Sequence, residues 1–347
     1  MELKELIVSL AGLMSVSGSE AVSHGALCDL VGHVFDEHST DAMGNHLFVK
    51  KCGREGAPKI LIDTHFDEIG MMVTDIRDGG FLTVTNIGGV DTRILPCGEV
   101  IVYGKKPIYG VVASLAPHLM KPEDKNKLRP IGEMLIDTGY SREELEEYVS
   151  IGTPVGFKPI YKELQNGRIC GKAFDDKACA ACAVRGIESV AAEDMAGDVY
   201  LLLSASEELG GRGAKVAGFG IRPDYALVID VTHASIPDVQ TRYLSPMDSG
   251  VVVEASAVTG RRLTNMMIDV CSRAGVPYTV QAAPSSTGTN ANLLGTAGEG
   301  IPTVLISLPI KNMHSAAEVL SLADAEALVR AVAAFACSKE IAEVYGR

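Results

Sequence analysis

The chain has 347 residues, of which 47% are hydrophobic and 22% charged, and it contains no tryptophan. This composition is typical of a globular protein and excludes a disordered, fibrous or disulfide-stapled chain. At this length folding buries about 75% of the surface of the unfolded chain, so one large domain or two smaller ones are expected. The formal net charge of -13 repels phosphate backbones and anionic lipid, so we expect neither nucleic acid nor a membrane as a partner.

The cysteines and the N-terminus indicate a cytoplasmic protein. Eight cysteines are spread from Cys28 to Cys337, mostly in apolar segments, which indicates free thiols in a reducing compartment. Glu2 and Glu5 stand where a signal peptide carries positive charge. No segment approaches 18 consecutive apolar residues, so we also expect no transmembrane helix.

Taken in chain order, the hydrophobic pattern predicts an α/β fold. Apolar residues at three- and four-residue spacing predict an amphipathic helix over residues 3–13. Ser17 and Glu20 have capping-box spacing, which predicts a second helix through about residue 34. From residue 59 onward, short apolar runs alternate with helical patterns at 177–193, 211–218, 261–274 and 322–343. This alternation predicts a mixed, largely parallel sheet flanked by helices on both faces.

Residues 68–162 interrupt this alternation. They contain closely spaced short strands, many glycines and one helical segment, SREELEEYV. We therefore predict a catalytic α/β domain formed by residues 1–67 and 163–347, with a small β-rich domain inserted at 68–162. Residues 117–130 are polar and bounded by prolines, which predicts an exposed loop within the insertion.

The candidate chemistry lies where the apolar runs end, because ligands of open α/β sheets bind beyond the carboxyl ends of the strands. Histidines and acidic residues stand at the ends of these apolar runs or directly before a helix. They are His65, Asp67, Asp175, Asp176, Glu207, Glu208, Asp230 and His314. Several carboxylates in one cleft repel each other unless cations neutralise them. Two histidines with carboxylates and no thiolate suit a pair of zinc-, cobalt- or manganese-like ions.

Two such ions about 3.5 to 4 Å apart can activate one water and stabilise both oxygens of a tetrahedral intermediate. A carboxylate next to a ligand, but not itself a ligand, can then move protons. The tandem Glu207-Glu208 offers this division of roles, because neighbouring residues on an extended backbone point in different directions.

At these residues the sequence resembles the tetrahedral-particle (TET) aminopeptidases, also described as glutamyl or deblocking aminopeptidases (metallopeptidase family 42), a family of dinuclear metallopeptidases with a zinc-exopeptidase-like fold. The resemblance extends over nearly the whole chain and depends on the order and spacing of several segments. These are SGSE, HFDEIGMMV, PHLMKPEDKNK, KAFDDKA, SASEELGGRGA, PDYALVIDV and MHSAAEVLSLAD.

The resemblance implies a set of metal ligands in this chain. His65, Asp175 and Asp230 would hold one ion, and Asp175, Glu208 and His314 the other, with Asp175 as the bridge. Zinc or cobalt is the expected metal, and manganese is a further option. The resemblance also implies a cis peptide bond after Asp175, although the next residue is not proline.

The resemblance further implies the roles of two more residues. Glu207 would be the general base that takes a proton from the attacking water and returns one to the leaving amine. Asp67 would orient His65 through its other ring nitrogen. The expected activity is removal of N-terminal residues from short peptides. The inserted domain would form dimers, and the dimers would assemble into a hollow dodecamer.

Four positions need a separate interpretation. Lys311 stands where many relatives have arginine, and Asn290 stands where relatives tend to have aspartate, so substrate positioning and selectivity are expected to differ. Cys179 and Cys182 have the CxxC spacing of redox motifs but lie in an alanine-rich helical segment. We interpret them as small packing residues.

Three alternative functions stay open. A carboxypeptidase or deacylase can use the same catalytic core, although its added domain typically follows the tandem-glutamate strand. A glycosidase with paired carboxylates is disfavoured because the chain has only 5% aromatic residues for sugar stacking. The third alternative is a catalytically weak assembly subunit that keeps the fold.

Overall fold

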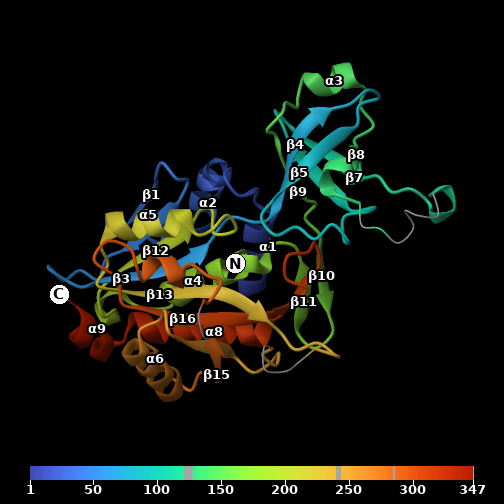
Figure 1. Ribbon diagram of the computed structural model, residues 1–347. Coiled ribbons are helices and arrows are strands. Elements are labelled where there is room, and N and C mark those ends of the chain that lie inside the picture. The colour runs from blue at the N-terminus through green and yellow to red at the C-terminus, as the bar shows by residue number, and fades with distance from the viewer. Residues whose placement is uncertain (121–126, 128, 240–243, 284–285, 347) are drawn as a thin grey trace.

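The computed structural model describes residues 1–120, 127, 129–239, 244–283 and 286–346, and it contains two separate β-sheets (Figure 1). The larger sheet has 11 strands and forms the body of the molecule. The smaller sheet closes into a barrel that projects from this body, at the upper right of Figure 1. No helix in the described part of the chain is long and apolar enough to cross a membrane.

The large sheet is mixed and has a parallel centre. Its main path runs through β1 (Glu37–Thr40), β2 (His46–Lys50), β12 (Asp198–Ser204), β3 (Lys59–His65), β13 (Tyr225–His233), β16 (Thr303–Lys311), β17 (Glu318–Ser321), β11 (Arg168–Gly171) and β10 (Tyr161–Leu164). Off this path, β14 (Val251–Ser256) pairs with β16 and with β15 (Tyr278–Ala283). The neighbours β12, β3, β13 and β16 are parallel, which confirms the predicted fold class.

Helices cover both faces of this sheet, as predicted. One core lies under α1 (Leu3–Gly12), α2 (His24–Val31), α4 (Phe174–Glu188), α6 (Arg261–Arg273), α8 (Leu322–Ala336) and α9 (Lys339–Tyr345). A second core lies under α5 (Arg212–Ile221) and α7 (Ala291–Leu294). Ile60 and Ile62 of β3 enter the first core and Leu61 enters the second, because successive residues of a strand point to opposite faces.

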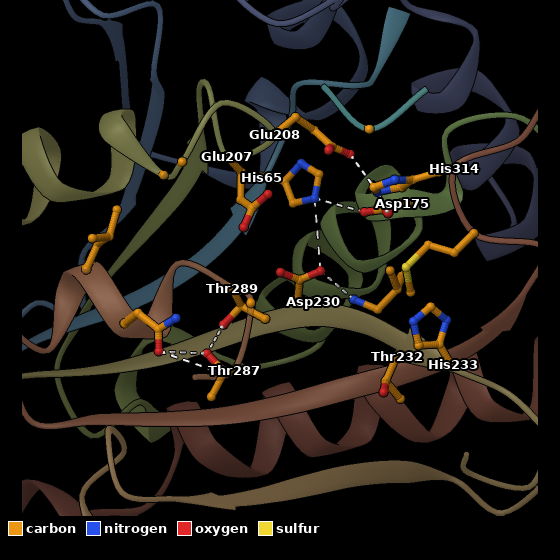
Figure 2. A pocket seen from close by; sticks show the side chains of 18 of the residues that line it. His65, Asp175, Glu207, Glu208, Asp230, Thr232, His233, Thr287, Thr289 and His314 are labelled. Atoms are coloured by element: carbon orange, nitrogen blue, oxygen red, sulfur yellow. Dashed lines mark hydrogen bonds and ion pairs between the residues drawn. The ribbon is translucent and has the colours of Figure 1, made fainter. Parts of the chain in front are cut away.

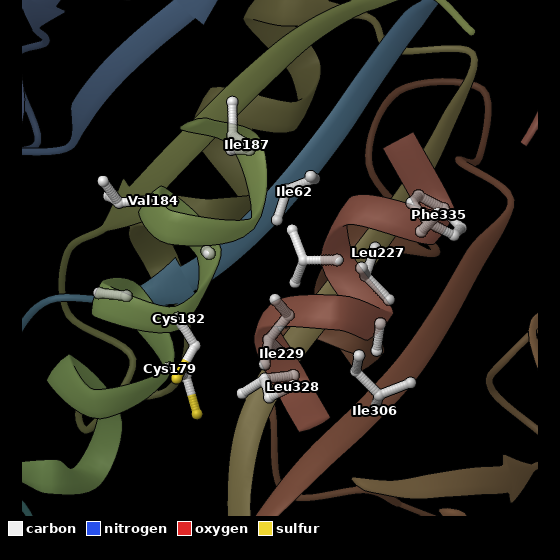
Figure 3. Close-up of a cluster of buried hydrophobic side chains, with 14 of the residues drawn as sticks. Ile62, Cys179, Cys182, Val184, Ile187, Leu227, Ile229, Ile306, Leu328 and Phe335 are labelled. Atoms are coloured by element: carbon white, nitrogen blue, oxygen red, sulfur yellow. The ribbon is translucent and has the colours of Figure 1, made fainter. Parts of the chain in front are cut away.

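Figure 3 shows the first core where α4 and α8 pack against the central strands. Cys179 and Cys182 are fully buried here and unpaired, which agrees with a packing role rather than a redox motif. The two helices approach closely at Gly186, where an added Cβ would lie 2.7 Å from the Val332 side chain. The alanine-rich sequence of α4 therefore allows close helix packing.

The barrel has its own hydrophobic core. Its closed path contains β4 (Gly70–Ile76), β5 (Leu82–Ile87), β8 (Leu135–Asp137), β7 (Pro107–Val112), β6 (Glu99–Tyr103) and β9 (Pro154–Phe157). The predicted helix in SREELEEYV is the short α3 (Arg142–Glu146), which begins with a capping box between Ser141 and Glu144. Much of the predicted loop 117–130, namely 121–126 and 128, lies outside the described residues.

Two helix predictions are wrong in detail. The predicted capping box at Ser17 and Glu20 does not form, because the Ser17 hydroxyl donates to the Asp67 carboxylate and the buried Glu20 carboxylate accepts from the backbone of Ser206. The helix instead starts with a 3-10 turn at Glu20–Ser23 and continues as α2. The predicted helix 322–343 is interrupted between α8 and α9, with Ser338 at the N-cap of α9.

Candidate metal centre

The parallel strands bring the predicted site residues to one edge of the sheet (Figure 2). His65 is the last residue of β3 and is in register with Ser204, the last residue of β12. Glu207 and Glu208 follow β12 directly, and Asp230 lies in the second half of β13. These side chains come together because parallel strands end at the same edge.

Two further elements complete the cluster. His314 follows β16 and adopts a left-handed backbone conformation with φ of 63°. Asp175 lies in the first turn of α4, and its peptide bond to Asp176 is cis, as the family resemblance implies. The structure therefore brings together all five predicted ligands with Glu207 and Asp67.

The first group of donor atoms belongs to His65, Asp175 and Asp230. His65 Nε2 lies 2.9 Å from Asp175 Oδ1 and 4.0 Å from Asp230 Oδ1. The three donor atoms lie within 4.8 Å of one another. All three side chains are buried.

The second group shares Asp175 with the first. His314 Nε2 lies 3.2 Å from Asp175 Oδ2 and 3.1 Å from Glu208 Oε1. Asp175 therefore directs one carboxylate oxygen to each histidine, and it is the one residue common to both groups. This geometry could hold two neighbouring metal ions with a shared carboxylate.

Asp67 lies next to His65, but its contacts differ from the expected one. The Asp67 backbone carbonyl accepts from His65 Nδ1 at 2.9 Å, whereas the nearest carboxylate oxygen is 3.6 Å away. The carboxylate instead accepts the backbone N–H groups of Glu207 and Glu208, at 2.9 and 3.1 Å. Asp67 thus fixes His65 through its backbone and the tandem glutamates through its side chain.

The hydrogen-bonded pairs of the site shift the pKa values of both partners. Burial by itself lowers the pKa of His65, but its hydrogen bond with Asp175 and the nearby Asp67 carboxylate raise it well above its ordinary value. Hydrogen bonds with Asp175 and Glu208 raise the pKa of His314 to about 11. Burial raises the pKa of Asp175, but its bonds with the two histidines dominate and lower it. Protons thus stabilise this cluster of carboxylates where no metal is bound.

The pKa values of three other carboxylates, those of Asp230, Glu207 and Glu208, are raised. Burial, with a contribution from the charge of Asp176, raises the pKa of Asp230 well above its ordinary value. Burial raises the pKa of Glu207 to about 7, and the negative charges of Glu208 and Asp67 add to this shift. Burial also raises the pKa of Glu208, and its hydrogen bond with His314 opposes this shift without overcoming it. These groups lack sufficient positive charge around them.

The cluster opens into a cavity of about 640 Å³. The cavity is lined by five carboxylates, those of Asp175, Glu207, Glu208, Asp230 and Glu254. Among its described lining residues there is no lysine or arginine. Cations or protons from outside the chain must therefore balance its charge.

The barrel also contributes to this cavity. Gly89, which follows β5 in the loop after the strand, lines the cavity beside His314. An added Cβ at Gly89 would lie 2.8 Å from His314 Nδ1, so only glycine leaves room for the ring. The insertion therefore forms part of the wall of the site.

The two positions that depart from the family pattern do not line the cavity. Asn290 is buried and its amide donates to Asp63 Oδ2 at 3.0 Å and to Ser204 Oγ at 2.8 Å. Lys311 ends β16, where it pairs with Val319 of β17. Asn290 thus supports the sheet behind the site.

Sequence reasoning missed Glu318, which holds the second group together. Its buried carboxylate accepts the backbone N–H groups of His314 at 2.9 Å, Phe174 at 2.6 Å and Asp175 at 3.1 Å. Burial and the charge of Asp175 raise the pKa of Glu318 to about 8. Its only sequence signal is its place in the segment MHSAAEVLSLAD.

Imidazoles and carboxylates clustered at the carboxyl edge of an α/β sheet are typical of metal-dependent hydrolases. A family model described as M42 glutamyl aminopeptidase matches residues 44–330, and the chain belongs to this family. A lysyl aminopeptidase of Pyrococcus furiosus is 31% identical over 331 residues, which cover 94% of this chain and 94% of that protein. The chain is therefore an aminopeptidase, an enzyme that hydrolyses peptide bonds.

Solved structures share the whole fold. A TET aminopeptidase from a marine sediment archaeon of the Thaumarchaeota superimposes with a TM-score of 0.91 at 29% identity, covering 99% of this chain and 98% of that chain. The TET1 peptidase of Pyrococcus horikoshii has a TM-score of 0.83 at 27% identity, covering 96% and 99%. The latter is described as assembling into a tetrahedron or a large octahedral shell.

Proposed function

We propose that this aminopeptidase uses two divalent metal ions and removes N-terminal residues from short peptides. The observation that carries the proposal is the pair of donor groups that share Asp175, with one of its oxygens facing each group. His65 and Asp230 would complete one metal site, and Glu208 and His314 the other.

The donors fit such ions in type and spacing. Donor atoms on one tetrahedral zinc lie about 3.4 Å apart, and the separations here are 2.9 to 4.0 Å. Two imidazoles and three carboxylates suit zinc or cobalt, with manganese as a further option. The ions would also replace the protons that the cluster otherwise holds, because metal binding requires deprotonated ligands.

Glu207 is the proposed general base. The ions, when bound, would polarise the peptide carbonyl and lower the pKa of the attacking water. Glu207 lines the cavity next to both donor groups without belonging to either, and its pKa is raised toward neutrality by burial. It can therefore take a proton from the water and deliver one to the leaving amine.

The charge of the cavity favours an aminopeptidase over a carboxypeptidase. A carboxypeptidase needs a cationic side chain for the terminal carboxylate of its substrate. The described residues that line the cavity include no lysine or arginine, whereas carboxylates such as Glu254 can bind the ammonium group of a peptide N-terminus. The cavity volume suits the end of a peptide rather than a folded protein.

Replacement of Glu207 and removal of metal test this function. Glu207→Gln should lower kcat on a peptide amide by about 10²- to 10⁴-fold, because the amide cannot accept the proton. Metal content measured by mass spectrometry should stay unchanged, and a chelator should abolish activity of the unmodified enzyme. The exposed Glu143→Gln is the matched control. Activity that persists in Glu207→Gln would remove the assigned base.

We also propose that residues 68–162 form a dimerisation domain and that dimers build a dodecamer. A solved structure of PhTET1-12s, which superimposes with a TM-score of 0.84 at 27% identity, is described as a dodecamer in the asymmetric unit, and this supports the proposal. A cytoplasmic location remains a prediction, supported by eight free cysteines.

A further inference from the structure

A second cluster of side chains that could hold a metal lies on α2 and on β1, the first strand of the hairpin β1–β2; Figure 1 labels both elements. His24 and Cys28 lie one turn apart on α2, so their side chains share one face of the helix. His38 reaches the same point from the edge strand β1. Cys28 Sγ lies 3.5 Å from His24 Nε2 and 3.4 Å from His38 Nδ1.

The spacing of these atoms matches a single zinc ion. With usual Zn–S and Zn–N bond lengths, nitrogen and sulfur ligands of one tetrahedral ion lie about 3.6 Å apart. All three donor atoms here lie within 4.8 Å of one another. His38 is exposed and the other two side chains are half-buried, so an ion can enter from solvent and keep a water as its fourth ligand.

A third histidine, His46, fixes the tautomer of His24. The ring of His46 is fully buried, and its Nε2 lies 3.2 Å from the backbone carbonyl of Glu20. A carbonyl only accepts, so Nε2 of His46 carries the proton and Nδ1 of the neutral ring is left to accept. That Nδ1 lies 3.1 Å from His24 Nδ1 and 3.4 Å from the hydroxyl of Thr40.

His24 must therefore donate from Nδ1 to His46. The lone pair of its Nε2 then points toward Cys28 and His38, where an ion would bind. Metal-binding histidines usually donate their other ring N–H to a partner in this way, which fixes the ring orientation. The planes of the His24 and His46 rings are nearly parallel, at 16°, and the ring centroids lie 5.2 Å apart.

We propose that His24, Cys28 and His38 form a binding site for a single zinc-like ion, separate from the catalytic pair. One thiolate and two imidazoles select a softer ion than the oxygen-rich catalytic donors do. The ion would join α2 to β1, whose four residues are all exposed at the edge of the sheet. It would thus stabilise an edge strand that has a pairing partner on one side, β2.

Cobalt binding tests this site with a readout that the catalytic centre does not give. Co²⁺ bound to a thiolate absorbs in the near ultraviolet by charge transfer from sulfur, and neither catalytic donor group contains sulfur. The metal-free full-length chain, titrated with Co²⁺, should show this absorption. Cys28→Ser should abolish it, and His38→Ala should weaken Co²⁺ binding at this site at least about tenfold.

Cys97→Ser is the matched control, because Cys97 is the exposed cysteine of the inserted segment, and it should leave the absorption unchanged. Absorption that is absent from the unmodified chain, that survives in Cys28→Ser, or that disappears in Cys97→Ser overturns the proposal. Because Cys28 and His38 are accessible to solvent, both variants should fold, which their circular dichroism can verify. Peptide hydrolysis tests the catalytic centre separately, so the two proposals can fail independently.

Discussion

Two buried carboxylates hold the proposed site residues through backbone hydrogen bonds. Asp67 accepts the N–H groups of Glu207 and Glu208, and Glu318 accepts those of Asp175 and His314. Such bonds fix the backbone, so that each side chain needs few rotations to reach its position. The geometry of the proposed metal ligands therefore depends on residues that do not line the cavity.

Replacement of Glu318 gives a prediction at the scale of single residues. Glu318→Gln replaces one acceptor oxygen by an NH₂ group, so at least one of its three backbone N–H donors loses its partner. We expect the affinity for zinc at the second donor group to fall about 10- to 100-fold, as for other outer partners of metal ligands. Competition with a chromogenic chelator measures this affinity.

The exposed Glu326 on α8 provides the control for this variant. Glu326→Gln should bind zinc like the unmodified chain. Equal affinities of the two variants would show that Glu318 does not position the ligands.

At the scale of elements, the sequence predicts the parts that follow from hydrophobic periodicity. The continuous apolar runs of β3 and β13 identify buried parallel strands, and the residues that end them, such as His65, therefore identify the site edge. The buried strand β12 likewise places Glu207 and Glu208, which follow it directly, at this edge of the sheet. Which residues converge is thus largely predictable, since strand order and direction determine it.

Contacts between distant segments were not predictable in this way. Ser17 and Glu20 have the local spacing of a capping box, but bonds to Asp67 and to the backbone of Ser206 replace it in the folded chain. Glu318 has no local pattern that distinguishes it from a surface glutamate. These residues act through partners that are brought close only by the tertiary fold.

A buried ion cluster connects the end of β3 with the start of α4. Glu68 pairs with Lys172 and, at 3.2 Å, with Lys177, and all three side chains are buried. Burial raises the pKa of Glu68, but the two lysines outweigh this effect and lower it. Burial lowers the pKa of Lys177 to about 7, and the charge of Glu68 opposes this shift. The carboxylate is therefore the counter-charge for Lys172 and favours the charged form of Lys177.

Removal of this counter-charge should strongly destabilise the chain. Glu68→Gln leaves two buried lysines without a carboxylate, and we expect the free energy of unfolding to fall by about 3–5 kcal/mol. Urea denaturation of the metal-free chain measures the change. The exposed pair Lys4–Glu163 is the control, and Glu163→Gln should cost no more than about 1 kcal/mol. Similar losses in both variants would contradict a special role for the buried cluster.

At the scale of the whole molecule, the barrel has a core of its own, and the inserted segment also exposes several large hydrophobic side chains. Large exposed hydrophobic side chains occur in the inserted segment at Ile94, Tyr109, Leu115, Leu119 and Ile151. Of these, Ile151 is 73% exposed, in the turn that precedes β9. Exposed apolar residues mark protein interfaces where they form a contiguous patch, so these side chains are the candidates for the proposed dimer contacts.

The donor side chains of both proposed metal groups come from one chain, so assembly is not required to bring these donors together. In a hollow particle, however, the cavity would face an enclosed space, and only unfolded peptides small enough to enter could reach it. Assembly is thus expected to control which substrates reach the site rather than the chemistry itself.

If assembly controls the access of substrates and not the chemistry, a variant that assembles poorly should still hydrolyse a small substrate. Light scattering of the unmodified chain should give a mass near twelve times 36.6 kDa. Ile151→Asp, which places a charge in the proposed interface, should give smaller particles, since burying an unpaired carboxylate is costly. Its kcat on a dipeptide amide should be nearly unchanged, because no metal ligand is altered. A monomeric mass for the unmodified chain would contradict the proposed dodecamer. An unchanged mass for Ile151→Asp would contradict the role of Ile151 in the interface. Neither result would affect the assignment of the ligands.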